Sequence, residues 1–524
     1  MGVLLAPQVG ERAGEVALVD ADGATTWGSL DERVDRLVHA LRARGLQQGD
    51  TVALMAGNQR AALEVALACL QGGWLVVPVN WHWVPAELAH VLDDAEAAAL
   101  VVGAAWVDDA VEAEGLVRDA EAAAGRVRIA IAEDVPDGFE AYESVLAAVP
   151  ADAGMPEAVR GGVMFYTSGT TGHPKGVRGG LAVVGGPAEM WQLMAASLSE
   201  VLDPGATPVQ LVCGPLYHSA QWVFAIMPLL LGARLVLQHR FDAAEVLELI
   251  DRHGVTNTHL VPAQFVRLLK LPATTRAAFS GASLHRVHHG AAPCPPDIKR
   301  RMIEWWGPII TEYYGGTEGG FITAISSEEW LERPTSVGKP LSVIEVLVVG
   351  PDGSQLPAGE PGDLYFRSLL GIDFEYHKAA AKTEAAHLEP GVGTLGDIGH
   401  LDEDGYLHLS DRRIDMIISG GVNIYPAEIE GLLVSHPDLV DAAVFGIPHD
   451  EMGEQVMAVV VPVESRSEDD GLIDELDAHL RAQLAGYKCP RRWELAASLP
   501  RNEAGKLLKR QLREPYWSGV ERAI

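Results

Sequence analysis

The feature that most constrains the fold of this chain is a repeated alternation of short apolar runs with segments of helical periodicity. A strand is predicted at Thr51–Met55, an apolar helix around Leu63–Leu70 and a second strand at Trp74–Val79. Apolar residues at helical spacing over Leu30–Leu41 predict an earlier helix, which Gly45 ends. Since β-α-β units build parallel sheets covered by helices, the pattern predicts an α/β fold.

The same alternation returns past the first third of the chain. Strands are predicted at Ala233–Leu237 and Val255–Val261, with a helix between them. Asp242 is expected to cap this helix, Glu245 to complete a capping box three residues later, and Gly254 to end it. The repetition predicts parallel-rich sheets over a large region.

The composition of the sequence changes near residue 411. A polar, turn-rich segment, SDRRIDMIISGGVNIYPAEIE at 410–430, precedes predicted strands at Ala442–Phe445 and Val456–Val463 and a helix at Ile473–Leu484. This order indicates a small, mobile α+β domain joined through a hinge. The predicted division is a large domain over 1–411, a hinge over 412–415 and a small domain over 416–524.

Charge and hydropathy exclude several classes of partner. The chain has 72 acidic and 40 basic residues, a formal net charge of -32, which repels nucleic acid and anionic membrane surfaces. The most apolar run, Val223–Leu237, is interrupted by Pro228 and is too short to span a bilayer. No basic start precedes an apolar core at the N-terminus, and the four cysteines are scattered, so we expect a cytoplasmic protein without a zinc site or disulfide framework.

The strongest chemical signal is YTSGTTGHPKG, Tyr166–Gly176, which follows an apolar strand at Gly162–Tyr166. Its glycines allow tight backbone turns, its hydroxyls add donors and Lys175 adds a positive charge, a combination that suits a triphosphate. It is not a Walker A loop, because it lacks Gly-Lys followed by Ser or Thr at the required spacing. The alternative is an ordinary solvated loop, which would not explain the terminal Pro-Lys-Gly. The candidate nucleotide contacts are Thr167, Ser168, Gly169, Thr170, Thr171, Gly172 and Lys175.

With this motif the chain resembles the adenylate-forming superfamily, which includes acyl-CoA synthetases, luciferases and peptide-synthetase adenylation domains. The resemblance covers nearly the whole chain, and the motifs follow the family's order. A second motif, EYYGGTEGG at Glu312–Gly320, implies that Tyr314 stacks on adenine, Thr317 contacts phosphate and Glu318 holds Mg²⁺. A hard cation that bridges phosphates needs such a carboxylate oxygen. The further nucleotide contacts implied here are Tyr313 and Gly315.

Two more segments resemble parts of the family's pocket. VHHGAAPC, Val287–Cys294, matches the small-residue loop against the adenine face, where close approach is expected at Gly290, Ala291 and Ala292. GPLYHSAQW, at 214–222, resembles the segment whose aromatic or His residue lies beside the acid and the thiol tunnel, which here is His218. The implied acyl-pocket residues are Tyr217, His218, Gln221 and Trp222.

The segment GTLGDIGHLDEDGYLHLSDRRID implies that Asp397 binds the ribose hydroxyls and that Arg412 binds ribose or phosphate. It also departs from the family pattern, which usually has Thr-Gly-Asp where this chain has Leu395-Gly396-Asp397. The hinge position that usually carries Asp or Lys is Ile414, whose apolar side chain cannot make polar contacts that favour one domain orientation. These departures leave open an enzyme with weak adenylation that acts mainly on a supplied acyl-adenylate.

The resemblance implies a ligase that joins a carboxylic acid to AMP using ATP and then passes the acyl group to coenzyme A. Lys506, in LPRNEAGKLLKR, would swing into the site for the first step, where a mobile ammonium offsets negative charge; a plain basic tail is the alternative. Gly420 and Gly421 would then face the CoA arm. ATP, Mg²⁺ and CoA are expected, with an apolar acid, fatty or polycyclic. A stand-alone enzyme that loads an acyl-carrier protein and a homodimer both remain open.

Two functions other than a ligase are compatible with parts of this pattern. A luciferase-type oxygenase shares the fold and would be recognised by light or oxygen consumption. A non-catalytic nucleotide-binding protein would bind ATP without turnover, and Lys175, Glu318 and Lys506 argue against it.

Overall fold

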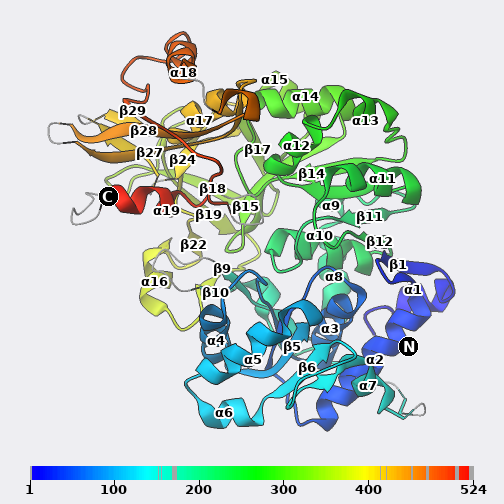
Figure 1. The fold of residues 1–524 in the computed structure, drawn as a ribbon. Helices are drawn as coiled ribbons and strands as arrows, with labels where there is room; N and C mark the ends of the chain where they lie inside the picture. The colour runs from blue at the N-terminus through cyan, green and yellow to red at the C-terminus, as the bar shows by residue number, and fades with distance from the viewer. Residues whose placement is uncertain are drawn as a thin grey trace.

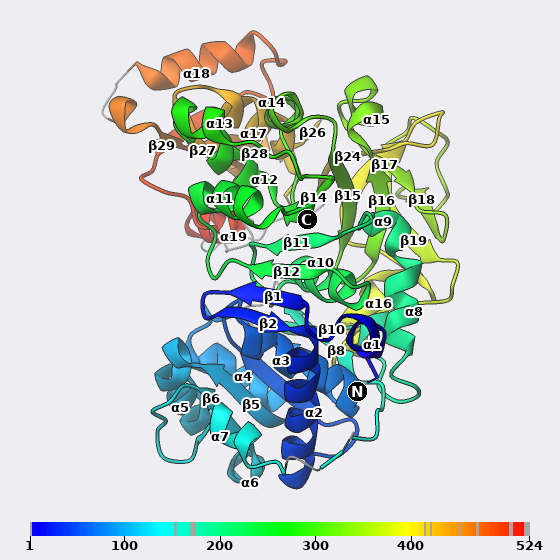
Figure 2. The ribbon, with the colours of Figure 1, turned by 90° about the vertical axis from the view of Figure 1, so that its right-hand side faces the viewer.

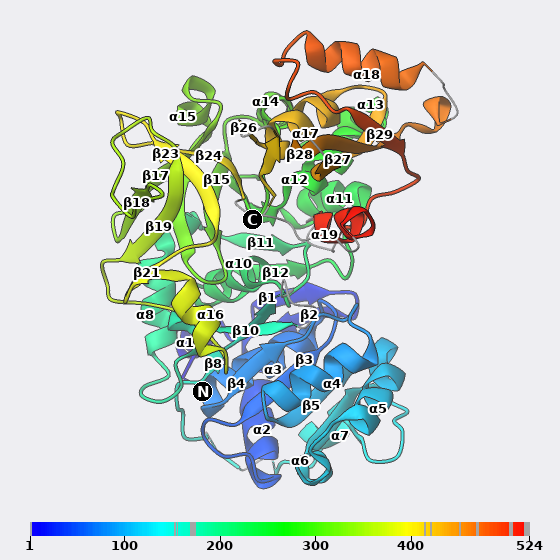
Figure 3. The same cartoon turned by 90° about the vertical axis from the view of Figure 1, so that its left-hand side faces the viewer.

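The chain folds into a large N-terminal α/β domain and a smaller C-terminal domain, as the sequence predicts. In all three views the C-terminal domain, in orange and red, lies at the opposite end of the molecule from the N-terminal segments drawn in blue (Figure 1, Figure 2 and Figure 3). The computed structural model describes residues 3–150, 153–154, 156–167, 174–412, 415–419, 422–449, 452–467, 471–501 and 507–517.

A fully parallel six-stranded sheet forms within the first part of the described chain, in the order β7-β6-β5-β3-β4-β8. Helices cover both faces, so successive residues of β3 enter different cores. Val52 and Leu54 pack against the cluster of α2, α3 and α7, and Ala53 and Met55 against that of α4 and α5. The predicted β-α-β unit is confirmed. The bounds are α1 (Ala6–Arg12), α2 (Trp27–Ala43), β3 (Thr51–Met55), α3 (Arg60–Gly72), β4 (Leu75–Pro78), α4 (Pro85–Asp94), β5 (Ala97–Gly103), α5 (Val107–Leu116), α6 (Ala120–Gly125), β6 (Val127–Ile131), β7 (Glu140–Ala141), α7 (Tyr142–Ala147) and β8 (Gly162–Val163).

A long mixed sheet forms the middle of the molecule. Among the described residues its order begins β2-β1-β12-β11-β13-β14-β15, with parallel pairing from β1 to β15, and continues antiparallel through β16-β17-β24-β23-β19. Helices α11, α12 and α14 cover one face of its parallel half. The bounds are β1 (Val16–Asp20), β2 (Gly23–Thr26), α8 (Met190–Ser197), α9 (Ser199–Leu202), β11 (Val209–Val212), α10 (Ser219–Leu230), β12 (Arg234–Leu237), α11 (Ala243–His253), β13 (Asn257–Leu260), α12 (Pro262–Leu269), α13 (Ala273–Ala278), β14 (Arg286–His289), α14 (Pro296–Trp306), β15 (Ile310–Gly316), β16 (Gly320–Ile325), α15 (Ser327–Glu332), β17 (Ser336–Pro340), β18 (Ile344–Val349), β19 (Gly362–Ser368), β21 (His387–Glu389), β22 (Val392–Gly393), β23 (Asp397–Leu401) and β24 (Leu407–Arg412).

A small three-stranded sheet forms separately among the described residues, in the order β20-β10-β9. It pairs β10 with both β9 and the distant β20, all antiparallel. It therefore joins the predicted phosphate motif to a segment about two hundred residues further along. The bounds are β9 (Phe165–Thr167), β10 (Lys175–Arg178), β20 (Glu375–Tyr376) and α16 (Ala380–Ala385).

The helix predicted between β12 and β13 is α11, and one part of its predicted cap is wrong. The Asp242 carboxylate accepts from the Glu245 amide at 2.8 Å, and Gly254 ends the helix at φ +61°. The reciprocal bond of a capping box does not form, because the Glu245 carboxylate accepts from Gln238 Nε2 at 2.6 Å instead. A tertiary partner outcompetes the local one.

The most apolar run of the sequence divides between two elements rather than forming one span. Pro228 lies inside α10, and the chain turns at Gly232, at φ +90°, before β12 begins. No helix in the described part of the chain is long and apolar enough to cross a membrane.

The C-terminal domain is built on a separate five-stranded sheet. Among the described residues its order is β26-β25-β28-β27, with β29 also paired to β28. Helices α17 and α18 cover one face and α19 the other. The domain contacts the large one where Lys270 Nζ donates to the Val440 carbonyl at 3.3 Å. The bounds are β25 (Ile417–Ser419), β26 (Val422–Ile424), α17 (Pro426–Ser435), β27 (Leu439–His449), β28 (Gly453–Pro462), α18 (Leu472–Arg481), β29 (Arg492–Leu495) and α19 (Lys509–Arg513).

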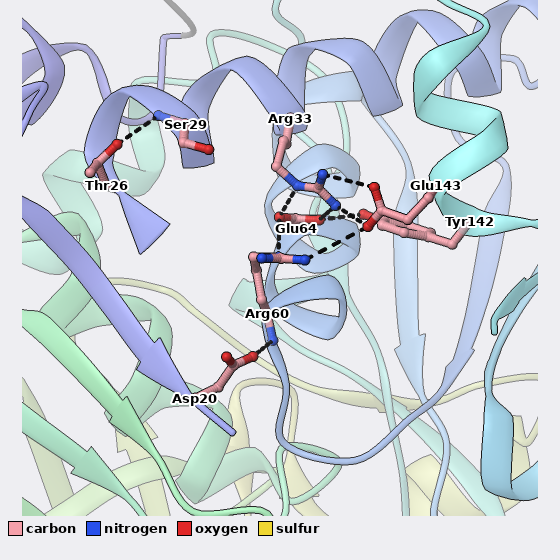
Figure 4. A network of polar contacts seen from close by, with 8 residues as sticks. All are labelled: Asp20, Thr26, Ser29, Arg33, Arg60, Glu64, Tyr142 and Glu143. Atoms are coloured by element: carbon pink, nitrogen blue, oxygen red, sulfur yellow. Dashed lines mark hydrogen bonds and ion pairs between the residues drawn. The ribbon is translucent and has the colours of Figure 1, made fainter. Parts of the chain in front are cut away.

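A polar network centred on Glu64 holds three helices of the first domain together (Figure 4). The Glu64 side chain is fully buried and accepts from Arg33 Nε at 2.6 Å and from the Tyr142 hydroxyl at 2.8 Å. Arg33 also binds the exposed Glu143 carboxylate, and Arg60 lies 3.3 Å from Glu64. Because the buried carboxylate has several donors, its burial is compensated and it fixes α2, α3 and α7 relative to one another.

Candidate active site

Lys175 and Glu318 come from different sheets and meet at one tyrosine side chain. Lys175 Nζ lies 3.6 Å from the centroid of the Tyr376 ring. The Tyr376 hydroxyl donates to Glu318 Oε1 at 3.1 Å. Burial lowers the pKa of Lys175, and the nearby Glu318 carboxylate partly offsets that effect. A cation and a carboxylate held this close can serve phosphate oxygens and a hard metal ion.

The strand pair β9–β10 carries the ends of the predicted phosphate motif. Thr167 lies directly opposite Lys175 in the antiparallel ladder. The Thr167 hydroxyl is buried and has no hydrogen-bond partner among the described residues. It therefore remains available to a ligand oxygen.

Several predicted site residues lie outside the described residues. They are Ser168, Gly169, Thr170, Thr171 and Gly172 of the phosphate motif, Ile414 of the hinge, Gly420 and Gly421 of the CoA segment, and Lys506. Arg412 ends β24 opposite Asp397 in the ladder, and only its backbone is described.

The second motif forms the hairpin β15–β16, whose turn holds Thr317 and Glu318. Gly315 is required at the hairpin base, because a Cβ there would lie 1.9 Å from the Gly320 carbonyl oxygen. The Thr317 hydroxyl lies 2.9 Å from that of Ser219, the first residue of α10. The turn is thereby tied to the helix that follows His218.

Tyr314 and Asp397 form a second polar pair from distant parts of the sequence. The Tyr314 hydroxyl donates to Asp397 Oδ2 at 2.7 Å, and Asp397 is 7% exposed. Tyr314 comes from β15 and Asp397 begins β23. An aromatic ring beside a carboxylate suits a purine base and the ribose hydroxyls attached to it.

The small-residue loop after β14 lies against Tyr313. A Cβ at Gly290 would come within 2.7 Å of the Tyr313 ring and of its carbonyl oxygen. Ala291 has φ +65°, a left-handed conformation that is uncommon outside glycine, and Ala292 follows it. Gly290 is therefore needed because Tyr313 packs directly against it. The Tyr313 side chain, predicted to contact the nucleotide, is buried in this structure.

A buried polar chain runs from α10 through β13 to β15. Gln221 Nε2 donates to His259 Nδ1 at 2.8 Å, and His259 Nε2 lies 3.0 Å from the Tyr313 hydroxyl. Burial, reinforced by the neighbouring His288, lowers the pKa of His259 to about 3, so the ring is neutral. Since Nδ1 accepts, Nε2 carries the proton and donates to the Tyr313 oxygen. Phe224 stacks on the His259 ring at 4.6 Å.

The four predicted acyl-pocket residues face different directions. Tyr217 and Trp222 line an apolar cavity of about 10 Å³ between α3 and α10, which has room for a water molecule but not for an acyl group. Gln221 points instead to His259 on β13. His218 precedes α10, with its ring 4.5 Å from that of Tyr217. Adjacent helical residues diverge by 100°, which separates Gln221 from Trp222.

Sequence reasoning missed Tyr376, Ser219 and His259. Tyr376 lies in a short strand without a recognisable pattern, and the hydroxyl of Ser219 matters only because the Thr317 turn is folded beside it. His259 lies within a strand that reads as ordinary core, Asn257–Leu260. No group of three or more potential metal ligands occurs among the described side chains, and Glu318 is the carboxylate whose charge raises the pKa of Lys175 against the effect of burial.

Comparisons with known proteins identify relatives along nearly the whole chain. The sequence model of the AMP-binding enzyme matches residues 5–370, and that of the AMP-binding enzyme C-terminal domain matches residues 428–506. A feruloyl-CoA synthase from an Amycolatopsis species is 34% identical over 496 residues, which cover 94% of each chain. A fatty acid–[acyl-carrier-protein] ligase from Streptomyces coeruleorubidus is 30% identical over 507 residues, which cover 95% of this chain and 93% of the ligase.

A solved structure is similar over the full length. The amide bond synthetase from Marinactinospora thermotolerans superposes with a TM-score of 0.82 at 29% identity, covering 98% of this chain and 99% of the synthetase. By their names, these three relatives make different products: feruloyl-CoA, a fatty acid joined to an acyl-carrier protein, and an amide bond.

Proposed function

Because the chain belongs to the family of AMP-binding enzymes, we propose that it is an AMP-forming acyl-CoA ligase. In the first step a carboxylate oxygen attacks the α-phosphorus of ATP, pyrophosphate leaves and an acyl-adenylate forms. In the second step the CoA thiol, losing its proton, attacks the acyl carbon and AMP leaves. The observation that carries the proposal is the convergence of Lys175 and Glu318 on Tyr376. The β15–β16 hairpin that holds Glu318 also holds Tyr314, which binds Asp397 on β23 of the same long sheet.

The residues of this chain act by position and charge, since no covalent enzyme intermediate is needed. We assign the phosphates of ATP to Thr167, Lys175 and Thr317, and the adenosine to Tyr314 and Asp397. Support comes from the buried Thr167 hydroxyl, which has no partner in the part of the chain that the structure describes, and from the Tyr314–Asp397 hydrogen bond. The further assignments carried by the family pattern are Ser168, Gly169, Thr170, Thr171, Gly172, Gly315 and Arg412 for the nucleotide, Lys506 for adenylation, and Gly420 and Gly421 for CoA.

The residues present fit a magnesium ion carried in with ATP. Glu318 offers a carboxylate beside Lys175, and one or two protein carboxylates suffice for Mg²⁺ when phosphates supply the other ligands. Bound there, the ion would neutralise phosphate charge.

The small domain is proposed to rotate relative to the large domain between the two steps, about a hinge at 412–415. Strand β24 of the long sheet ends at Arg412, and β25 of the separate small sheet begins at Ile417, which leaves a short connection between two independent sheets. Such a movement is a gating step that can limit turnover.

The acid is proposed to be apolar, either aromatic or fatty. The two curated relatives described above act on ferulic acid and on a fatty acid by their names.

A second candidate is a ligase with the same first step and a different acceptor, as the carrier-protein ligase and the amide synthetase suggest. A third is an enzyme with weak adenylation, because of Leu395 and Ile414. Both candidates predict distinct products from the same assay.

The test is mass spectrometry of purified protein incubated with Mg²⁺-ATP and a panel of hydroxycinnamic, other aromatic and fatty acids. Acyl-AMP that converts to acyl-CoA when CoA is added would support the proposal. Acyl-AMP that persists with CoA, but disappears with a carrier protein or an amine, would support the second candidate. Conversion only of synthetic acyl-adenylates would support the third, and no product under any condition would refute all three.

A further inference from the structure

We propose that Tyr376 is a positioning residue for the triphosphate end of ATP, holding the Lys175 ammonium and the Glu318 carboxylate ready to receive it. The inference rests on the proposed function and extends it to a residue outside the motifs identified from the sequence. Its basis is that one side chain contacts both groups: the ring faces Lys175 Nζ at 3.6 Å and the hydroxyl donates to Glu318 at 3.1 Å.

The backbone fixes Tyr376 to the strand that carries Lys175. Tyr376 pairs with Val177 in the antiparallel ladder between β20 and β10. Its amide donates to the Thr383 hydroxyl at 2.9 Å, which ties β20 to α16. The side chain is 8% exposed. Strand pairing and the bond to Thr383 therefore fix the Tyr376 ring beside the Lys175 ammonium.

Glu318 reaches the same ring from another sheet. It lies in the β15–β16 turn of the long sheet, whereas Tyr376 and Lys175 belong to the three-stranded sheet. The hydrogen bond from the Tyr376 hydroxyl to Glu318 thus links the three-stranded sheet to the long sheet, beside the two groups proposed to bind the ligand, Lys175 and Glu318. The Glu318 carboxylate can only accept a hydrogen bond, so the Tyr376 hydroxyl is the donor at 3.1 Å.

The geometry explains why a tyrosine suits this place. Lys175 and Glu318 attract each other, and the described contacts join them through Tyr376 rather than through a direct ion pair. A direct pair would have to break before Lys175 could bind phosphate and Glu318 a metal ion. A neutral phenol holds both charges through weaker contacts that ligand groups can replace.

The chain contains a matched control at Tyr406. Its hydroxyl donates to Glu329 Oε1 at 3.0 Å, and Arg333 lies over its ring at 4.3 Å. This tyrosine repeats the arrangement of a cation over the ring and a carboxylate at the hydroxyl, outside the proposed site. Tyr406→Phe therefore reports what such a bond contributes to folding alone.

The experiment is calorimetric binding of Mg²⁺-ATP and of AMP to the purified full chain and to Tyr376→Phe, Tyr376→Leu and Tyr406→Phe. AMP lacks the β- and γ-phosphates, so it separates positioning of the triphosphate from a general loss of structure. We expect Tyr376→Phe to weaken Mg²⁺-ATP binding about tenfold, the size of one hydrogen bond to a charged group, and to leave AMP binding within about twofold. Tyr376→Leu should weaken Mg²⁺-ATP further, since it also removes the ring.

Each other outcome overturns a defined statement. If Tyr376→Phe binds Mg²⁺-ATP as the parent does, or if it loses AMP and Mg²⁺-ATP equally, Tyr376 is not a positioning residue. If Tyr406→Phe shows the same selective loss, the effect does not belong to this site. If the parent chain binds neither ligand, the proposed function itself fails, a result that differs from all of these.

Discussion

The buried pair Lys299–Glu312 anchors the strand that carries the second motif, and its loss has a calculable cost. Lys299 Nζ lies 2.6 Å from Glu312 Oε2, with the lysine side chain fully buried and the carboxylate 8% exposed. Lys299 also lies over the Trp330 ring at 4.6 Å. Glu312 is on β15, two residues before Tyr314. Lys299→Met keeps the apolar volume and removes the ammonium that binds Glu312. The His289 ring, with Nε2 3.7 Å from Glu312 Oε2, remains beside the carboxyl, and burial lowers the pKa of this histidine.

The expected loss is limited by protonation of Glu312. Breaking a buried pair costs about 3–5 kcal/mol, because it leaves an uncompensated charge. Burial already raises the pKa of Glu312, opposed by Lys299, so in the variant the carboxyl takes up a proton. Holding a carboxyl of ordinary pKa about 4.3 neutral at about pH 7 costs roughly 3.7 kcal/mol, and at about pH 5.5 roughly 1.6 kcal/mol. The loss therefore grows as pH rises above the unfolded-state pKa of Glu312, because folding then requires uptake of a proton, and it levels off once pH exceeds the raised folded-state pKa.

The assay is urea unfolding followed by tryptophan fluorescence at both pH values, on the full chain and three variants. The matched control is Arg252→Met, which breaks the exposed pair Arg252–Glu248 and should cost under about 0.5 kcal/mol. Lys299→Met combined with Glu312→Gln should recover more than half of the loss, because no buried charge remains. A loss in Lys299→Met as small as that of the control, or equal at both pH values, would refute the reasoning.

Three other outcomes follow from single contacts. Glu64→Gln should lower the free energy of unfolding in urea by about 3 kcal/mol, since it leaves Arg33 facing a neutral group, whereas the exposed Glu143→Gln should cost under about 1 kcal/mol; equal losses would contradict the network. Burial, with a neighbouring carboxylate, raises the pKa of Asp35 to about 6, so its ionisation opposes folding above that pH; Asp35→Asn should raise the melting temperature at pH 8, and the gain should vanish near pH 4. Tyr314→Phe should weaken AMP binding severalfold in calorimetry, because Asp397 loses its donor; unchanged affinity would remove the pair from the nucleotide site.

The sequence predicted those parts of the fold that depend on local signals. Strand β3 has the predicted bounds, Thr51–Met55, because its residues are buried on both faces and turn signals flank it. Gly254 ends α11 as predicted, since only its own backbone conformation decides the cap. The capping box failed at Glu245, because Gln238, close in space through β12, competes for its carboxylate. A local pattern cannot include such a partner.

The site was predictable where a motif brings its own chemistry, and unpredictable where folding brings two segments together. Lys175 was a candidate from the chemistry of its motif, and Glu318 was a candidate from the family resemblance of the second motif. Their common contact, Tyr376, depends on pairing between β10 and β20, which nearly two hundred residues separate. The same holds for Gln221 and His259, because the direction of Gln221 is set by the packing of α10 on β13.

The departure at Leu395 changes the chemistry of the turn before Asp397 without leaving a polar group unpaired there. The Thr394 hydroxyl donates to the Leu364 carbonyl at 2.6 Å and accepts from the Gly396 amide at 2.9 Å, so it stabilises the turn itself. The Leu395 methyl groups lie 3.2 Å from where a Cβ on Gly316 would be, next to the Thr317–Glu318 turn. Leu395 thus contributes apolar packing to the hairpin and no hydrogen bond to a nucleotide. Efficient adenylation would then require that the proposed nucleotide groups, among them Lys175, Glu318 and the Tyr314–Asp397 pair, bind ATP without a hydroxyl at position 395.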